Sequence, residues 1–273
     1  MGRRTEIDYN KIYKSHRYGN YIILKEVEPI IGSDGYPDRQ VKIKFLQTGT
    51  ECITYLSSAI SEQVRDPYFP IYFNVGYIGT VKNPTFHILH DTWYRMLSRC
   101  YNHKDNHYMS YGSIGVSVDQ RWHNFENFIY DCQFLYNYDK FISTKGIYQL
   151  DKDYLQQNVP KNKRVYSKDT CIFLNRWDNI NLRTIENKET HKSKYYGVWK
   201  NNSSSYKVDF YTNGKLICRA TLDNEIAAAN MYNTYAEKYD ASELVPLRND
   251  VPYMSPEEVM THIKSDRDLI KNV

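Results

Sequence analysis

Alternating apolar and polar positions occupy much of the N-terminal part of the chain and predict short β-strands. Runs rich in β-branched and aromatic residues are separated by glycine-containing turns and cover residues 21–24, 40–45 and 51–55. In the second run Val41 and Ile43 would share one face, with Lys42 on the other, because successive side chains of a strand point to opposite sides. We therefore predict a small β-rich domain over residues 1–82.

Apolar residues at spacings of three and four replace this alternation further along the chain. The spacing predicts one helix over residues 90–100 and a second over residues 125–136. Residues 150–183 are then typical of a strand, a loop, a short strand and a helix. Residues 83–186 therefore form the predicted central domain, and the polar residues 187–194 form a linker.

A further alternating region, residues 195–240, predicts three strands followed by a helix. Asn213-Gly214 between two alternating runs indicates a tight hairpin, because both central residues of that turn need positive φ. Asp223 is a good candidate for the N-cap of the helix. Small alanines on one helix face would let the helix lie close to the sheet, and the opposite sheet face would then carry Trp, Tyr, Lys and Arg side chains outward.

The last part of the chain carries a helix-start signature. Ser255 is a suitable N-cap, Pro256 suits the first helical position, and Glu258 completes a capping box. The predicted fold class is therefore α+β. It combines the small β domain, a central strand–strand–helix core with flanking helices, a three-stranded sheet plus helix over residues 195–250, and a C-terminal helix within residues 251–273.

Composition sets loose limits on function. The 273 residues carry 36 Lys and Arg against 32 Asp and Glu, but Lys-rich stretches at residues 161–164 and 188–200 would attract phosphate groups. The five cysteines are scattered, and no two have metal-ligand spacing. The sequence has no signal-peptide pattern and no apolar run of membrane-spanning length, so we expect a cytoplasmic protein without membrane association.

Oxygen-bearing side chains in the central domain are candidates for a metal site. Asp151 and Asp153 are two residues apart, so both would point to one side of a strand. Asp178 and Asn181 lie one turn apart on the predicted helix. A strand carboxylate and a helix amide can together hold a hard divalent cation, Mg²⁺ or Mn²⁺, which would stabilise the leaving oxygen of a cleaved phosphodiester. The predicted ligands are Asp151 and Asn181, and an exposed strand edge beside Lys152 is the alternative.

The C-terminal module also carries a set of family-like positions. They are Tyr195, Tyr196, Gly197 and Val198 at its start, Asn213, Gly214 and Lys215 at the turn, and Thr221, Leu222, Asp223, Ala228, Ala229, Tyr232 and Ala236 towards and within the helix. This pattern resembles the APETALA2 or ethylene-response-factor DNA-binding domain of plants, which also occurs in phage endonucleases. The resemblance implies that double-stranded DNA is the partner and that the outward sheet face contacts it. A domain that binds protein, or nothing, is the alternative.

The candidate DNA-contacting residues lie on the strands of this module and in the linker before it. They are Trp199, Lys200, Lys207, Asp209, Tyr211 and Arg219, together with Lys192 and Lys194. The plant domains carry Arg or Trp on the second and third strands where this chain has Tyr211, Leu216 and Cys218, so no target sequence follows from the resemblance.

The central domain has its own family-like positions. They include Trp93, Met96, Arg99, Cys100, Tyr101, Tyr111, Gly112, Gly115, Val116, Arg121, Trp122, Phe125, Glu126 and the run Leu150-Asp151-Lys152-Asp153. From about residue 90 to 185 they resemble the HNH, or ββα-metal, nucleases of phages and homing endonucleases. The resemblance implies that Asp151 and Asn181 are metal ligands.

The position of the family's general base differs in this chain. The family has a His directly after the strand Asp, whereas this chain has Lys152, so Lys152 and Asp153 are the catalytic candidates. Three alternatives stay open, because another group or a metal-bound water could act as the base, or the site could be inactive.

Taken together, these patterns predict a phage-type, metal-dependent DNA endonuclease, which would act in the host bacterial cytoplasm. One alternative is a catalytically degenerate DNA-binding regulator on the same scaffold. The other is a phage protein that binds and inhibits a host protein.

Overall fold

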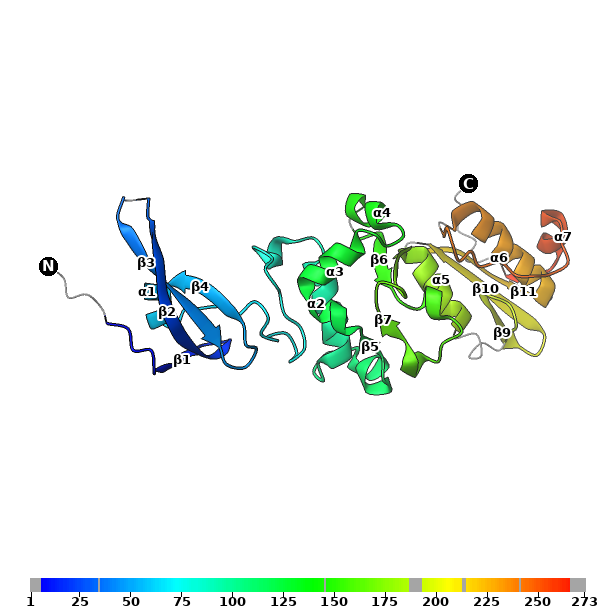
Figure 1. The fold of residues 1–273 in the computed structure, drawn as a ribbon. Helices are drawn as coiled ribbons and strands as arrows, with labels where there is room; N and C mark the ends of the chain where they lie inside the picture. The colour runs from blue at the N-terminus through cyan, green and yellow to red at the C-terminus, as the bar shows by residue number, and fades with distance from the viewer. Residues whose placement is uncertain are drawn as a thin grey trace. The chain divides into compact units, whose positions relative to one another are not determined.

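The structure is a computed structural model that describes residues 6–33, 35–144, 146–186, 193–212, 215–240 and 242–265. It has a mixed α and β fold and divides into two compact units (Figure 1). The first unit comprises Met1–Leu135 and Gln156–Cys171, and the second comprises Tyr136–Leu155 and Ile172–Val273. The predicted central domain, residues 83–186, is therefore divided between the two units. The predicted turn Asn213-Gly214 and the predicted contact residue Lys192 lie outside the described residues.

The N-terminal part of the first unit is a curled antiparallel sheet. Its strands lie in chain order, and they are β1 (Ile12–Ser15), β2 (Gly19–Ile31), β3 (Pro37–Phe45) and β4 (Glu51–Tyr55). The short helix α1 (Leu56–Ile60) follows. Val41, Ile43 and Phe45 are fully buried, as the alternating pattern of β3 predicts. The small β-rich element predicted at the N-terminus is thus confirmed as a sheet.

Two helices of the first unit carry the apolar faces that their spacing predicts. Trp93, Met96 and Leu97 of α2 (His90–Tyr101) are buried, as are Phe125, Phe128 and Cys132 of α3 (Phe125–Cys132). The second helix ends at Cys132, earlier than predicted, because the chain turns and reaches the next helix through Asn137 in the left-handed region. Short elements complete this unit: η1 (Pro84–Phe86), η2 (Tyr108–Ser110), η3 (Gly112–Ile114), η4 (Gln120–His123), η6 (Lys161–Lys163), and the parallel pair β5 (Ser117–Val118) and β7 (Val165–Tyr166).

The second unit begins with a ββα arrangement. After α4 (Tyr138–Ser143), β6 (Tyr148–Asp151) pairs antiparallel with β8 (Ile172–Asn175), and α5 (Arg176–Glu186) follows directly. A long connection separates the two strands and includes η5 (Tyr154–Gln156). The predicted order of strand, loop, strand and helix is therefore confirmed.

The C-terminal module packs a long helix on one face of a sheet. The sheet has the strand order β12-β11-β10-β9, and its members are β9 (Val198–Asn202), β10 (Ser205–Thr212), β11 (Lys215–Leu222) and β12 (Ile263–Ser265). Helix α6 (Glu225–Tyr239) buries Ala227, Ala228 and Ala229 in the same core as Val208 and Cys218 of the sheet. Residues as small as alanine allow the helix backbone to approach the sheet closely, as predicted.

A glycine permits another close approach in this module. Gly197 has a φ of 66°, and a Cβ added there would lie 2.1 Å from the ring of Tyr232. A side chain at this position would therefore collide with α6, and its backbone conformation would be strained.

Two predictions about this module are wrong in detail. The N-cap of α6 is Asn224 rather than Asp223, because the Asn224 carboxamide accepts from the backbone N–H groups of Ile226 and Ala227. The C-terminal segment predicted as a helix contains a helix and a strand. The capping box predicted at Ser255 starts α7 (Pro256–Thr261), and the chain then adds β12 to the free edge of β11.

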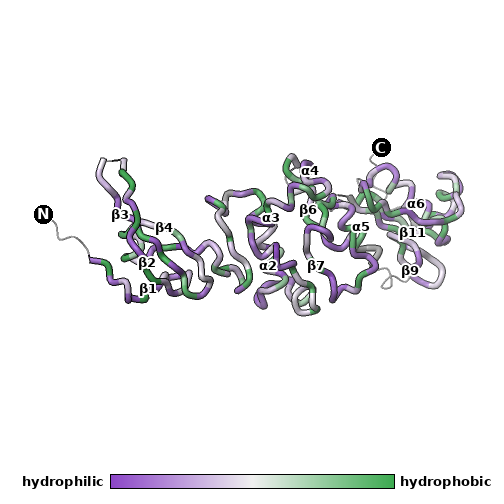
Figure 2. Tube along the Cα trace, viewed as in Figure 1, coloured by the Kyte–Doolittle hydropathy of each residue, from purple (hydrophilic) through white to green (hydrophobic). Residues whose placement is uncertain are grey.

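Apolar and polar residues are interspersed along the traced chain, as Figure 2 shows. Among the residues that the structure describes, no helix combines the length and apolar content that crossing a bilayer requires.

Candidate nucleic-acid interface

The sheet of the C-terminal module has one covered face and one outer face. Val208, Cys218 and Ala220 are buried against α6. Because side chains alternate along a strand, Lys207 and Asp209 of β10 and Arg219 of β11 lie on the opposite face. The register places Asp209 directly beside Arg219, and places Lys207 beside Trp199 of β9. Four of the predicted contact residues therefore share the outer face.

An ionic cluster occupies the centre of this outer face. Arg219 donates from Nε to Asp209 Oδ1 at 2.7 Å and from Nη2 to Asp209 Oδ2 at 3.1 Å. Lys207 Nζ lies 3.3 Å from the same Oδ2 atom. Arg219 Nη2 also donates to the hydroxyl of Tyr211 at 3.1 Å. We call Lys207, Asp209, Tyr211 and Arg219 the sheet cluster.

The members of the sheet cluster differ in exposure. The Asp209 side chain is only 9% exposed, whereas those of Arg219 and Lys207 are 32% and 37% exposed. Tyr211 is 51% exposed. Two partly exposed cations thus surround one carboxylate, and the cluster presents one net positive charge beside an aromatic ring. Solvent screens such pairs, so their contribution to stability is small.

Two other predicted contact residues lie away from the sheet cluster. Lys200 follows Trp199 in β9 and is paired with Tyr206, so it belongs to the side of the sheet that α6 covers, although it is itself exposed. Alternation reverses the side-chain direction at each position, so Lys200 is separate from the outer-face residues, and its contact with DNA stays a prediction. Lys194 is exposed, and its Nζ lies 5.0 Å from the centre of the Tyr195 ring.

The second predicted site begins where β6 ends. Asp151 is 4% exposed, and its Oδ1 accepts from the backbone N–H of Asp153 at 2.9 Å and of Tyr154 at 2.7 Å. Burial raises the pKa of Asp151 to about 6, with Asp153 adding to the rise and the Tyr154 N–H opposing it. The strand stops at Asp151, so the predicted alternation of Asp151 and Asp153 along one strand is wrong.

The two catalytic candidates contact each other. Lys152 is 4% exposed, and its Nζ lies 2.6 Å from Asp153 Oδ1. In this contact Lys152 is a hydrogen-bond donor, whereas a general base must offer a lone pair to a proton. This pair therefore gives no support to Lys152 as a general base.

The predicted helix ligand faces a different part of the chain. Asn181 of α5 donates from Nδ2 to the backbone carbonyl of Val245 at 2.9 Å. Asp178, fully buried one turn earlier, accepts the backbone N–H groups of Glu243, Leu244 and Val245 at 2.7–3.1 Å. Asp151 and Asn181, which the sequence assigns to one cation, thus have separate partners.

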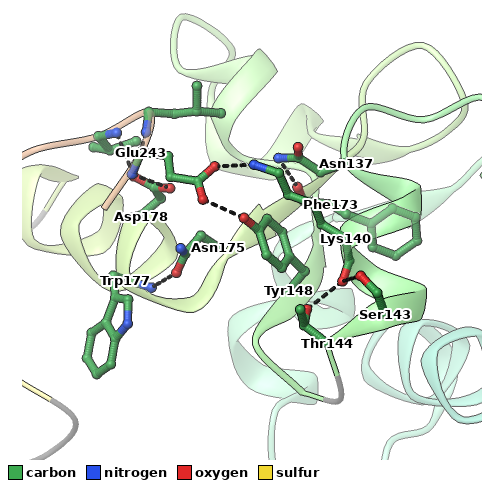
Figure 3. A network of polar contacts seen from close by, with 12 residues as sticks. Asn137, Lys140, Ser143, Thr144, Tyr148, Phe173, Asn175, Trp177, Asp178 and Glu243 are labelled. Carbon is green, nitrogen blue, oxygen red and sulfur yellow. Dashed lines mark hydrogen bonds and ion pairs between the residues drawn. The ribbon is translucent and has the colours of Figure 1, made fainter. Parts of the chain in front are cut away.

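A carboxylate from the same C-terminal segment extends this network (Figure 3). Glu243 Oε2 lies 2.7 Å from Lys140 Nζ, and Glu243 Oε1 accepts from the hydroxyl of Tyr148 at 2.6 Å. The hydrogen bond from Lys140, together with that from Tyr148, lowers the pKa of Glu243. Sequence reasoning missed this contact, because about a hundred residues separate its partners and no local motif marks them.

We also searched the described residues for clusters of three or more side chains that could bind a metal ion. No three His, Cys, Asp or Glu side chains among the described residues gather at a distance suited to one ion.

Comparisons with known proteins add no further constraint. No family model, curated protein or solved structure matches this chain. The class of protein must therefore be inferred from the two sites themselves.

Proposed function

We propose that this chain binds double-stranded DNA through the outer face of its C-terminal sheet. The observation that carries the proposal is the sheet cluster, in which Lys207 and Arg219 are held at one place on an exposed sheet face beside Tyr211. The major groove of B-form DNA admits a two-stranded β-ribbon, and β10 and β11, which carry Lys207 and Arg219, form an antiparallel pair of this kind within the sheet. Lysine and arginine on such a face would meet the phosphates that line the groove.

The two kinds of side chain on this face would contribute differently. Phosphate contacts from Lys207 and Arg219 would fix position and make binding strongly dependent on salt. Tyr211 and Trp199 would supply apolar contacts to base edges, such as the methyl group of thymine. The sheet would therefore bind duplex DNA mainly through phosphates and would distinguish base sequences only weakly.

The test is a titration of a fluorescently labelled duplex with the full chain, followed by anisotropy at several salt concentrations. A double variant, Lys207→Met with Arg219→Met, should weaken binding by about a hundredfold or more, since each phosphate or base contact contributes about 1–3 kcal/mol. Lys238→Met is a matched control, because Lys238 is an exposed cation on α6, on the covered side of the sheet. Equal losses in the double variant and the control would refute docking by the outer face.

A second candidate function is metal-dependent DNA cleavage of the phage endonuclease type. It is favoured by the ββα arrangement of β6, β8 and α5, with a buried carboxylate, Asp151, at the end of the first strand. Carboxylate and amide oxygens are ligands that Mg²⁺ and Mn²⁺ accept. The Val245 carbonyl holds the amide nitrogen of Asn181, which leaves the amide oxygen as the atom suited to a cation.

In that function Asp151 and Asn181 would hold Mg²⁺ or Mn²⁺, which supplies charge stabilisation for a leaving oxygen. Lys152 and Asp153 would lie beside the reacting phosphodiester. Lys152, which is buried and lies 2.6 Å from Asp153 Oδ1, would hold that carboxylate in place.

Plasmid DNA distinguishes these functions. Incubation with the protein and Mg²⁺ or Mn²⁺ should produce nicked circles that EDTA prevents, and Asp151→Ala should abolish the nicking. Duplex binding without cleavage under either metal would identify a DNA-binding regulator. Absence of DNA binding at low salt would remove both proposals and favour a protein that binds a host protein.

A further inference from the structure

Asp209 is the common partner of both cations in the sheet cluster. Its two oxygens accept from Arg219 Nε and Nη2, and the Oδ2 atom also lies 3.3 Å from Lys207 Nζ. Its backbone N–H donates to the carbonyl of Gly197 at 3.0 Å, so both its main chain and its side chain are fixed. The carboxylate therefore sits beneath two partly exposed cations.

We infer that Asp209 is a positioning residue that makes the sheet select duplex DNA over other polyanions. This inference rests on the proposed DNA contact. A guanidinium that is bound through two of its nitrogens lies in a fixed plane, so the directions of its N–H groups are fixed as well. Cations held in this way bind best where phosphates have matching positions, because less side-chain freedom is lost on binding.

The carboxylate also lowers the charge of the face. Lys207 and Arg219 without Asp209 would present two positive charges to any polyanion, whereas the sheet cluster presents one. Long-range attraction depends on this net charge and not on the arrangement of the acceptor. Asp209 thus reduces attraction that is common to all polyanions and keeps the contacts that depend on geometry.

Two other roles for Asp209 fit the structure less well. Direct contact with a base would need an accessible carboxylate, but this side chain is 9% exposed and both oxygens are occupied. A purely structural role would place its partners in the core, but Lys207 and Arg219 are partly exposed. The apolar residues against α6, not this cluster, form the core of the module.

The experiment measures binding of the full chain to a labelled duplex and to heparin, a polyanion without duplex geometry, over a range of salt concentrations. Asp209→Asn should tighten heparin binding by about threefold or more at low salt. It should also make the slope of log K against log salt for duplex steeper by about one, as one added phosphate contact would. The preference for duplex over heparin should fall. An unchanged slope together with an unchanged preference would overturn the inference.

A second variant tests geometry without changing charge. Arg219→Lys keeps the positive charge but loses the two-nitrogen contact with Asp209, so the salt slope should stay the same while the preference for duplex falls. If Asp209→Asn does not fold, as judged by circular dichroism, this variant decides. A preference equal to that of the unmodified protein would then refute the positioning role.

The matched control is Asp240→Asn. Asp240 is also 9% exposed and pairs with an arginine, Arg248, at 3.0 Å, but it lies at the end of α6 and not on the outer face. Asp240→Asn should change neither the salt slope for duplex binding nor the preference for duplex over heparin. A change equal to that of Asp209→Asn would refute the assignment to Asp209. If the unmodified protein fails to bind duplex, the proposed function itself is wrong. If the unmodified protein binds duplex and the variants show the same salt slope and the same preference, only the inference about Asp209 is wrong.

Discussion

Helix α5 and the outer sheet face each hold an aspartate surrounded by several donors, but the donors differ in kind. Asp178 of α5 is fully buried and accepts three backbone N–H groups from residues 243–245. Asp209 of β10 accepts from the side chain of Arg219 and forms an ion pair with Lys207, and both cations reach solvent. Both aspartates are thus surrounded by donors, but the donors of the buried Asp178 are backbone groups and those of Asp209 are partly exposed side chains.

The difference indicates what each carboxylate does. The backbone N–H groups of residues 243–245 would have no acceptor if they moved away from the buried Asp178. Asp178 therefore fixes this segment to α5. Side-chain cations that reach solvent can contact a phosphate as well as the carboxylate, since both are anionic oxygen acceptors. The kind of donor therefore separates a purely structural aspartate from one that could position cations for a ligand.

The largest effect should come from the buried residue. Asp178→Ala would leave three backbone N–H groups without an acceptor, and each unsatisfied buried donor costs about 1–3 kcal/mol. We expect the second unit to lose about 3 kcal/mol or more of its free energy of unfolding, measured by urea titration. Tyr253→Ser, which alters one of the most exposed side chains of the same unit, is the control and should change little. A loss below about 1 kcal/mol would contradict the structural role of Asp178.

The next effect should be on binding and not on folding. Arg219→Met should weaken duplex binding by about tenfold. It should change the free energy of unfolding by less than about 1 kcal/mol, because an exposed ion pair contributes little. Anisotropy and urea unfolding of the same preparation separate the two quantities. A large loss of stability with unchanged affinity would reverse the comparison between the two aspartates.

Asp151 is an intermediate case, because it is buried with two backbone donors. Its folded pKa of about 6 lies above the ordinary value of 3.8, so the folded chain binds this proton more tightly than the unfolded chain. In EDTA, its contribution to stability should be fully present below about pH 4 and lost as the pH rises through about 6, by about 3 kcal/mol. Asp151→Asn should remove that part of the pH dependence. Identical pH profiles in urea unfolding would show that the group titrates normally.

The same pair of proteins tests for a cation without any cleavage assay. Mn²⁺ added at pH 7 should raise the melting temperature of the unmodified protein if Asp151 is a ligand, because a ligand that binds only the folded state stabilises it. Asp151→Asn should respond less. Equal responses would place the ion elsewhere on the molecule.

The smallest effect should come from a surface pair. Asp223 Oδ1 lies 2.8 Å from His262 Nδ1, and both side chains are substantially exposed. Asp223→Asn should lower the free energy of unfolding by no more than about 0.5 kcal/mol, measured at pH 6. A loss comparable to that of Asp178→Ala would show that exposure does not govern these contributions.

Local patterns in the sequence predicted much of this fold. Alternation placed Val41 and Ile43 on one sheet face, and helical spacing placed Trp93 and Met96 on one helix face; all four are buried. Both predictions depend only on the period of a strand or helix, which neighbouring residues determine. The buried faces could therefore be predicted before the structure.

Contacts between distant residues could not be predicted in this way. The partner of Asn181 is the Val245 carbonyl, and a backbone carbonyl carries no sequence signal. Asp223 and Asn224 are both good N-caps, and the choice depends on which side chain reaches the first-turn N–H groups. β12 is only three residues long and gains its strand character from β11. In each case the prediction failed because the interacting group is brought into contact only by the folded structure.

The strand β12 also has a practical consequence for shortened forms of this protein. A fragment that stops before Pro256 would expose the outward N–H and C=O groups of Thr221 and Leu222, which β12 now pairs. Bare strand edges of this kind template the addition of strands from other molecules. Preparations of the isolated C-terminal module should therefore extend through Ser265 to stay monodisperse at the concentrations that crystallisation and NMR require.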